Sequence, residues 1–183
     1  MSNDPAFRTP LSDSNSRVPP HNVDAEASLL GAMLLSRDAI GPAVETLDGD
    51  QFYVPAHGYI FDAIASLYGA GEPADPVTVA EELTRSGLLE QIGGPQRLLE
   101  LQTATPASSN AARYAQIVEE HALLRRLIGV AGDIVELGYS RPEDVVKTVD
   151  EAEAMMFQIA ERRVVDTTKP ISCLLYTSPS PRD

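Results

Sequence analysis

The sequence predicts an all-α fold, with a compact N-terminal bundle of about six helices followed by a long αα-hairpin. Apolar residues recur at alternating spacings of four and three through 110–163, which is typical of helices that pack on other helices. No stretch shows the alternation of a half-buried strand, and no repeat of fixed period is present. Only 5% of the residues are aromatic and Trp is absent, which favours packing of aliphatic side chains between helices.

The N-terminal region begins with a polar segment. Residues 1–17 are rich in Ser, Asn, Asp and Pro, and they contain too few apolar residues to fold, so we expect a disordered tail. Val18-Pro19-Pro20 predicts an extended lead-in, because the residue before a proline avoids the helical region. Asn22 is the expected N-cap of the first helix, whose first turn carries Glu26 at the positive end of the helix dipole. Gly31 would let a neighbouring element approach this helix closely.

The remaining short helices of the predicted globular domain, 18–109, follow from proline, glycine and capping signals. They are a helix at 39–47 with an irregular start at Gly41-Pro42, a helix from Pro55 to about Tyr68, a helix opened by a Thr78–Glu81 capping box and ended by Gly87, and a helix that begins at Pro95.

The predicted hairpin covers 110–163. Gly138 is expected to end its first helix, and Ser140 with Glu143 forms a capping box that would open the second. Each helix carries one apolar seam by which the two would pack. The seam residues are Ile117, Leu124, Ile128, Ala131 and Val135 on the first helix, and Val145, Val149, Ala152, Met156 and Ile159 on the second.

Apolar residues also lie off this seam. Leu127, Ile134 and Leu137 fall on another side of the first helix, and two helices of this length bury only one face against each other. A further partner is therefore implied, which is the upstream domain, another copy of the hairpin or a different protein.

Composition limits the function classes. The net charge is −13, with 27 acidic and 14 basic residues, so broad binding of nucleic-acid phosphates is disfavoured. The basic pairs Arg125-Arg126 and Arg162-Arg163 remain possible local contacts to nucleic acid, but the favoured interpretation is that they are solvated ends of helices. The single cysteine, Cys173, excludes a disulfide framework. No apolar run is long enough to span a bilayer and the N-terminus lacks the apolar core of a signal peptide, so we expect a cytosolic protein with no membrane partner.

The sequence offers no constellation for catalysis. His21, His57 and His121 are dispersed without metal-ligand spacing, and His57 is interpreted as a packing residue. The glycine pair Gly93-Gly94 lacks the Lys and the spacing of a Walker loop, so no nucleotide site is predicted. Paired carboxylates, as at Glu119-Glu120, are expected on solvated helix faces. We therefore predict no catalytic, cofactor-binding or metal-binding residue.

The C-terminal residues differ in kind from those before them. Residues 164–172 are expected to start an interdomain linker, whereas 173–183, CLLYTSPSPRD, have no helical period and stop abruptly. This string resembles translated sequencing-adapter ends, so we interpret 173–183 as a non-native tail and exclude it from the fold.

Several short motifs, taken together, carry a family resemblance. Val18-Pro19-Pro20-His21, with the acidic Asp24-Ala25-Glu26 after it, resembles the opening V-P-P-H-x-x-E-A-E of bacterial replicative DNA helicases of the DnaB type, with Asp24 in place of the usual Glu. The segment from Asp50 to His57 resembles their D-x-F-Y…P-x-H. The match continues through about 163. Further matching pieces are Gly93-Gly94, Thr105-Pro106, Tyr114-Ala115-Gln116-Ile117-Val118, Arg126 and Phe157-Gln158-Ile159-Ala160-Glu161.

The resemblance implies a collar at the N-terminus of a ring helicase. In this family, hairpins of neighbouring subunits pair to give a trimer of dimers above a hexameric motor ring, and the collar docks the C-terminal domain of a DnaG-type primase. Leu127, Ile134 and Leu137 would then be candidates for the face that meets a second subunit or the primase. The chain would act at the replisome in the cytoplasm.

The resemblance also implies chemistry located elsewhere. ATP and Mg²⁺ would bind a motor domain beyond Ser172, which draws single-stranded DNA 5′ to 3′, and this chain alone should neither hydrolyse ATP nor unwind DNA. Two alternatives remain: a freestanding helical adaptor of the loader or inhibitor type, and a small helical enzyme that uses acidic pairs. A Walker loop encoded in frame downstream of Ser172 would favour the helicase collar over the adaptor and the small enzyme.

Overall fold

The computed structural model describes residues 18–105, 107–140 and 144–165, and the side chains within these ranges up to residue 159. Over this part of the chain the structure contains α-helices and short 3-10 helices but no strand, which confirms the predicted all-α fold. The predictions for 1–17, 166–172 and 173–183 lie outside the described residues. No helix in the described ranges is long and apolar enough to cross a membrane.

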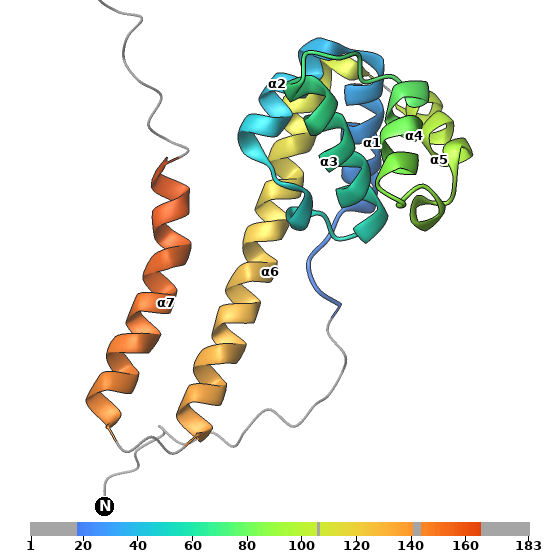
Figure 1. The fold of residues 1–183 in the computed structure, drawn as a ribbon. Helices are drawn as coiled ribbons and strands as arrows, with labels where there is room; N and C mark the ends of the chain where they lie inside the picture. Colours follow the sequence, from blue (N-terminus) through green and yellow to red (C-terminus); the bar gives the residue numbers. More distant parts are fainter. Residues whose placement is uncertain (1–17, 106, 141–143, 166–183) are drawn as a thin grey trace, which may run out of the picture.

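The architecture is a globular head with a long hairpin attached (Figure 1). Helices α1 and α2 pack on the first part of α6, α3 and α5 pack on α1, and α4 lies against α3 and α5. The second part of α6 extends away from the head with α7 alongside it. The elements are α1 (Val23–Leu35), α2 (Arg37–Thr46), η1 (Gly49–Gln51), α3 (Pro55–Gly69), α4 (Pro76–Arg85), η2 (Glu90–Ile92), α5 (Pro95–Ala104), η3 (Ser108–Asn110), α6 (Ala111–Tyr139) and α7 (Val145–Val165).

Helix α1 lies at the centre of the head, and it packs against α2, α3, α5 and α6. Its N-terminus is capped as predicted, because the side chain of Asn22 accepts a hydrogen bond of 3.0 Å from the backbone N–H of Ala25. The predicted close approach at Gly31 is also confirmed. A Cβ atom added there would lie 2.2 Å from the carbonyl oxygen of Leu101, on α5.

Helix ends differ from the prediction where a proline or a second capping residue competes. The predicted Thr78–Glu81 capping box is wrong, since α4 begins three residues earlier. Asp75 accepts hydrogen bonds from the N–H groups of Val77 and Thr78, and the Thr78 hydroxyl accepts from the N–H of Asp75. Pro76 suits the first helical position and so fixes this earlier start. Similarly, α2 begins at Arg37 and continues through Pro42.

The hairpin turn also lies later than expected. Helix α6 has 29 residues and passes through Gly138 to end at Tyr139. Helix α7 begins at Val145, and the side chain of Asp144 accepts a hydrogen bond of 3.1 Å from the N–H of Lys147. The predicted cap at Ser140 and Glu143 is not tested, because Glu143 lies outside the described residues.

Candidate interaction surface

Helix α6 carries the head on one row of its side chains. Ala111, Ala115, Val118 and Ala122 recur at spacings of four, three and four, and all four are buried. The next residue of the row is Arg125, which is half-buried at the rim of the head. Beyond it the row continues with Gly129, where an added Cβ would meet nothing within 4 Å. Along this row, the packing contacts between the head and α6 therefore end at Arg125.

A second row of α6 faces α7, which α6 contacts. This row, the inner row, contains the half-buried apolar residues of the outer part of α6, together with Leu127, which is 40% exposed. The matching row of α7 is half-buried as well. The inner row consists of Leu127, Val130, Ile134 and Leu137 on α6, and Thr148, Ala152, Met155 and Ile159 on α7.

A third set of apolar residues is exposed. It consists of Leu124, Ile128, Ala131 and Val135 on α6, and Val145, Val149 and Met156 on α7, and we call it the hairpin face. Its large members are between 44% and 66% exposed. Successive residues of a helix are about 100° apart around its axis. On α6 the hairpin face is therefore rotated by about 110° from the inner row, and on α7 it is rotated by about 70° from the inner row. Since the helices run in opposite directions, both displacements turn to the same side of the hairpin.

The opposite side of the hairpin is polar. The exposed residues there are Arg126 and Asp133 on α6, and Lys147, Glu151 and Gln158 on α7. The hairpin therefore has one apolar side and one polar side, and Val146 and Phe157 are exposed on the outer side of α7. An apolar surface that spans two helices is the kind that marks a protein–protein contact.

The structure divides the apolar residues differently from the sequence prediction. Of the ten predicted seam residues, only Ala152 and Ile159 lie in the inner row, whereas Ile117 is half-buried against the head. The other seven form the exposed hairpin face. Conversely, Leu127, Ile134 and Leu137, which were expected to face outward, belong to the inner row. Both rows repeat at spacings of three and four, so periodicity could not tell which one faces α7.

Arg125 makes the most extensive polar contacts of the junction between head and hairpin. Its guanidinium donates a hydrogen bond of 2.7 Å to the carbonyl of Pro20 and another to the carbonyl of Gln51. It also lies over the ring of Tyr53, at 5.8 Å from the ring centroid, and this ring stacks on His21. We call the five residues of this group the neck cluster: Pro20, His21, Gln51, Tyr53 and Arg125. The interpretation of Arg125 as a solvated residue is wrong, although Arg126 beside it is exposed.

A buried polar cluster lies inside the head. The Glu26 carboxylate accepts hydrogen bonds from the N–H groups of Tyr53 and Val54, at 2.7 and 3.3 Å, and from Nδ1 of His57 at 2.9 Å. Arg97 of α5 lies 3.3 Å from Nε2 of the same imidazole. The imidazole of His57 therefore lies between the carboxylate of Glu26 and the guanidinium of Arg97. The expectation that His57 is a packing residue agrees with its full burial.

Two carboxyl groups of the head have shifted pKa values. Burial raises the pKa of Glu26, but the hydrogen bonds from His57, Tyr53 and Val54 outweigh it, so the net pKa lies below the ordinary value. Burial raises the pKa of Asp62, the hydrogen bond from the N–H of Gly49 lowers it, and the nearby carboxylates of Asp48 and Asp50 raise it, for a net increase. Sequence alone placed Glu26 only at the start of a helix, and its proximity to His57 depends on the packing of α1 against α3.

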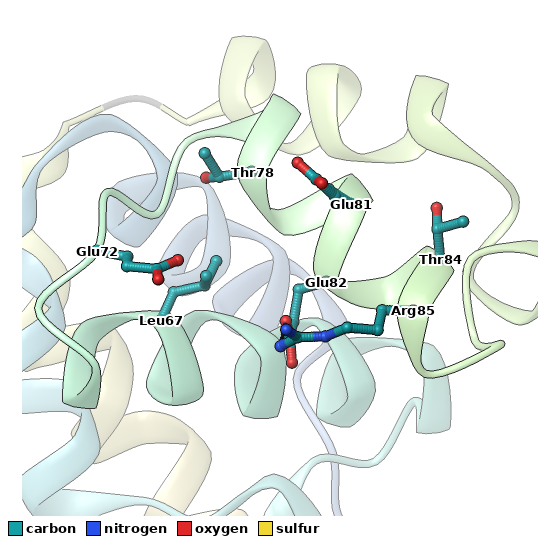
Figure 2. Close-up of a pocket in the computed structure, with 7 residues that line it drawn as sticks. All are labelled: Leu67, Glu72, Thr78, Glu81, Glu82, Thr84 and Arg85. Carbon is teal, nitrogen blue, oxygen red and sulfur yellow. Dashed lines mark hydrogen bonds and ion pairs between the residues drawn. The ribbon is translucent and has the colours of Figure 1, made fainter.

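A surface pocket of about 670 Å³ lies between α3 and α4 (Figure 2). Three of its polar groups are engaged within α4: Arg85 pairs with Glu82, and the hydroxyl of Thr84 donates to a carbonyl of the preceding turn. In the ranges that the structure describes, no three His, Cys, Asp or Glu side chains are grouped to hold a metal ion. The exposed hairpin face is the more distinctive surface feature, and we take it as the candidate for function.

Comparison with known proteins identifies relatives along most of the chain. Residues 18–120 match the family described as the DnaB-like helicase N terminal domain. The chain is 48% identical over 168 residues to the replicative DNA helicase DnaB of Mycobacterium leprae, covering 91% of this chain and 28% of that protein. It is 41% identical over 159 residues to the DnaB of Geobacillus stearothermophilus, covering 87% of this chain and 35% of the relative.

Solved structures agree with these relatives. The N-terminal domain of DnaB helicase from Mycobacterium tuberculosis superposes with a TM-score of 0.74 at 50% identity, over 77% of this chain and 99% of that one. A DnaB-like replicative helicase, whose structure was described with its interactions with primase, shares the fold with a TM-score of 0.62 at 24% identity, over 81% of this chain and 36% of that one. The chain spans about a third of the length of the curated relatives. It belongs to the family of DnaB-like helicase N-terminal domains.

Proposed function

We propose that this chain works as the collar of a replicative DNA helicase, where it assembles subunits through the hairpin and recruits a primase. The observation that carries the assembly role is the exposed hairpin face. Its members on α6 and α7 form one apolar side of a two-helix unit, and the side behind it is polar.

A second copy of the hairpin is the proposed occupant of this face. A two-helix surface that is apolar along its length can pair with itself around a twofold axis, because the same patch serves both partners. The head cannot cover the face of its own chain while it stays in place. The row that carries the head lies about 130° around α6 from the hairpin face, on the other side of the helix.

Analytical ultracentrifugation tests this pairing. The double variant Ile128→Asp with Val149→Asp places a charge on each helix of the face, and it should shift the chain from dimers or larger assemblies to monomers at tens of micromolar. Arg126→Asp with Lys147→Asp is the matched control, because it also places one acidic side chain on each helix, at exposed positions on the polar side of the hairpin. A wild-type chain that stays monomeric at high micromolar concentration would refute the proposal.

Recruitment of a primase is the second part of the proposal. It is supported by family membership and by the relative that was solved with its interactions with primase. Titration calorimetry of the chain with the C-terminal domain of a DnaG-type primase should show saturable binding. Absence of binding heat with the primase domain in large molar excess would count against recruitment, while leaving the pairing result unaffected.

The remaining activities belong by proposal to the whole protein. ATP hydrolysis with Mg²⁺ and 5′ to 3′ movement along single-stranded DNA, in the cytoplasm at the replisome, would require about two thirds of a relative's length beyond this region. An ATPase assay of a full-length protein that carries this region, with and without single-stranded DNA, checks that assignment.

A further inference from the structure

We propose that Arg125 is a positioning residue that holds the head at a fixed orientation on the hairpin. It lies at the place where the two parts of the molecule meet. On one side of it along the same row of α6 is the buried Ala122, and on the other is Gly129, around which the space is open. Arg125 is thus the last residue of this row that contacts the head.

Its contacts join segments that are far apart in the sequence. One guanidinium nitrogen donates to Pro20, in the lead-in to α1, and the other donates to Gln51, at the end of η1. These acceptors lie 105 and 74 residues away in the chain. A single side chain of α6 therefore fixes two loops at the bottom of the head against the helix that leaves it.

The aromatic part of the neck cluster lies against the guanidinium of Arg125. Tyr53 lies under it, the ring of His21 stacks on Tyr53 at 4.2 Å and 13°, and the backbone N–H of Tyr53 is held by Glu26 of α1. The position of Tyr53 is thus determined by the core of the head. The guanidinium of Arg125 contacts the Tyr53 ring and also donates two hydrogen bonds to the loops. The single ammonium group of a lysine could not make this set of contacts.

The described part of α6 beyond the neck cluster contains three glycines. Gly129 and Gly132 have open space where a side chain would be, and glycine is among the weakest helix formers. The orientation of the head therefore depends on the first turns of α6 and on Arg125. Without Arg125, the loops at 19–21 and 50–53 would be free to move away from α6, and the head would tilt over a range of angles.

Distance measurements between spin labels test this role in the full chain. With Cys173 replaced by Ser, labels at the exposed positions Ser66 of α3 and Lys147 near the hairpin tip report the separation of head and tip by double electron–electron resonance. An excess of unlabelled chain removes distances between copies. The tip lies about 20 Å beyond Arg125 along α6, so a tilt of about 15° moves it by about 5 Å.

The expected result is a graded one. Arg125→Ala should shift or broaden the distance distribution by about 5 Å, and Arg125→Lys, which keeps the charge but loses the paired donors, should lie between it and the wild type. Arg126→Ala is the control, since its side chain is exposed, and it should leave the distribution unchanged. Arg125→Ala with the wild-type distribution would overturn the proposal. If Arg125→Ala does not fold, a wild-type distribution for Arg125→Lys overturns it equally.

Discussion

Gly31 allows α1 and α5 to touch, and Gly31→Ala is expected to destabilise the head. The added Cβ would lie 2.2 Å from the carbonyl oxygen of Leu101 and 1.8 Å from Oγ1 of Thr105. Real Cβ contacts are essentially never closer than 3.0 Å, so the backbone of α5 would have to move away from α1 by about 0.8 Å. Forcing extra volume into a packed core costs about 1–3 kcal/mol or more, which exceeds the gain of about 1 kcal/mol in helix propensity.

Urea unfolding followed by circular dichroism measures this effect. A net loss of about 2 kcal/mol, with a slope of about 2 kcal/mol/M, lowers the midpoint by about 1 M. Gly69→Ala is the matched control in the same domain, because Gly69 lies in α3 with nothing within 4 Å of the added atom. It should raise the midpoint slightly or leave it unchanged.

A double variant shows which of the two contacts is responsible. Relative to Thr105→Ala alone, Gly31→Ala with Thr105→Ala should still be destabilised, since the backbone carbonyl of Leu101 remains in the way. Equal stability of Gly31→Ala and the wild type would refute the reasoning. Complete recovery in the double variant would refute the assignment of the obstacle to the backbone.

Two further perturbations concern polar groups of the head. The pKa of Glu26 lies below its ordinary value of 4.5, so its contribution to folding is present above that pH and is lost as the pH falls through the lower, folded-state pKa. Thermal unfolding at several pH values should show this loss in the wild type and a flatter dependence in Glu26→Gln, and parallel curves would contradict it. Asp75→Ala removes the N-cap of α4 and should lower stability by about 1 kcal/mol. The same change at the exposed Asp38, which caps no helix, is the control for that measurement.

Much of the fold could be predicted because its signals are local. Pro55 and Pro95 begin helices in the structure as in the prediction, and Asn22 caps α1. These preferences act through backbone atoms within a few residues, so tertiary packing rarely reverses them. Where two local signals competed, as at Asp75 and Thr78, the sequence was ambiguous and the prediction chose the wrong one.

The parts that could not be predicted depend on contacts between distant segments. Glu26 carries no mark of burial in its own helix, and its partner His57 lies 31 residues away. In the sequence, Arg125 does not differ from other basic residues on a helix. Its acceptors, the carbonyls of Pro20 and Gln51, belong to loops that only the fold brings beside it. On the hairpin, the inner row and the hairpin face have the same apolar character and the same spacing. Only the direction in which α7 returns separates them.

The three rows of α6 have a consequence for what an assembled pair could display. Head, partner helix and hairpin face occupy separate sectors of one helix, spaced by about 110° to 130°. Two copies joined through their hairpin faces would leave both heads uncovered, with α3, α4 and α5 open to solvent. Substitutions that weaken the pairing of the hairpin faces would then leave the surface of the head unchanged.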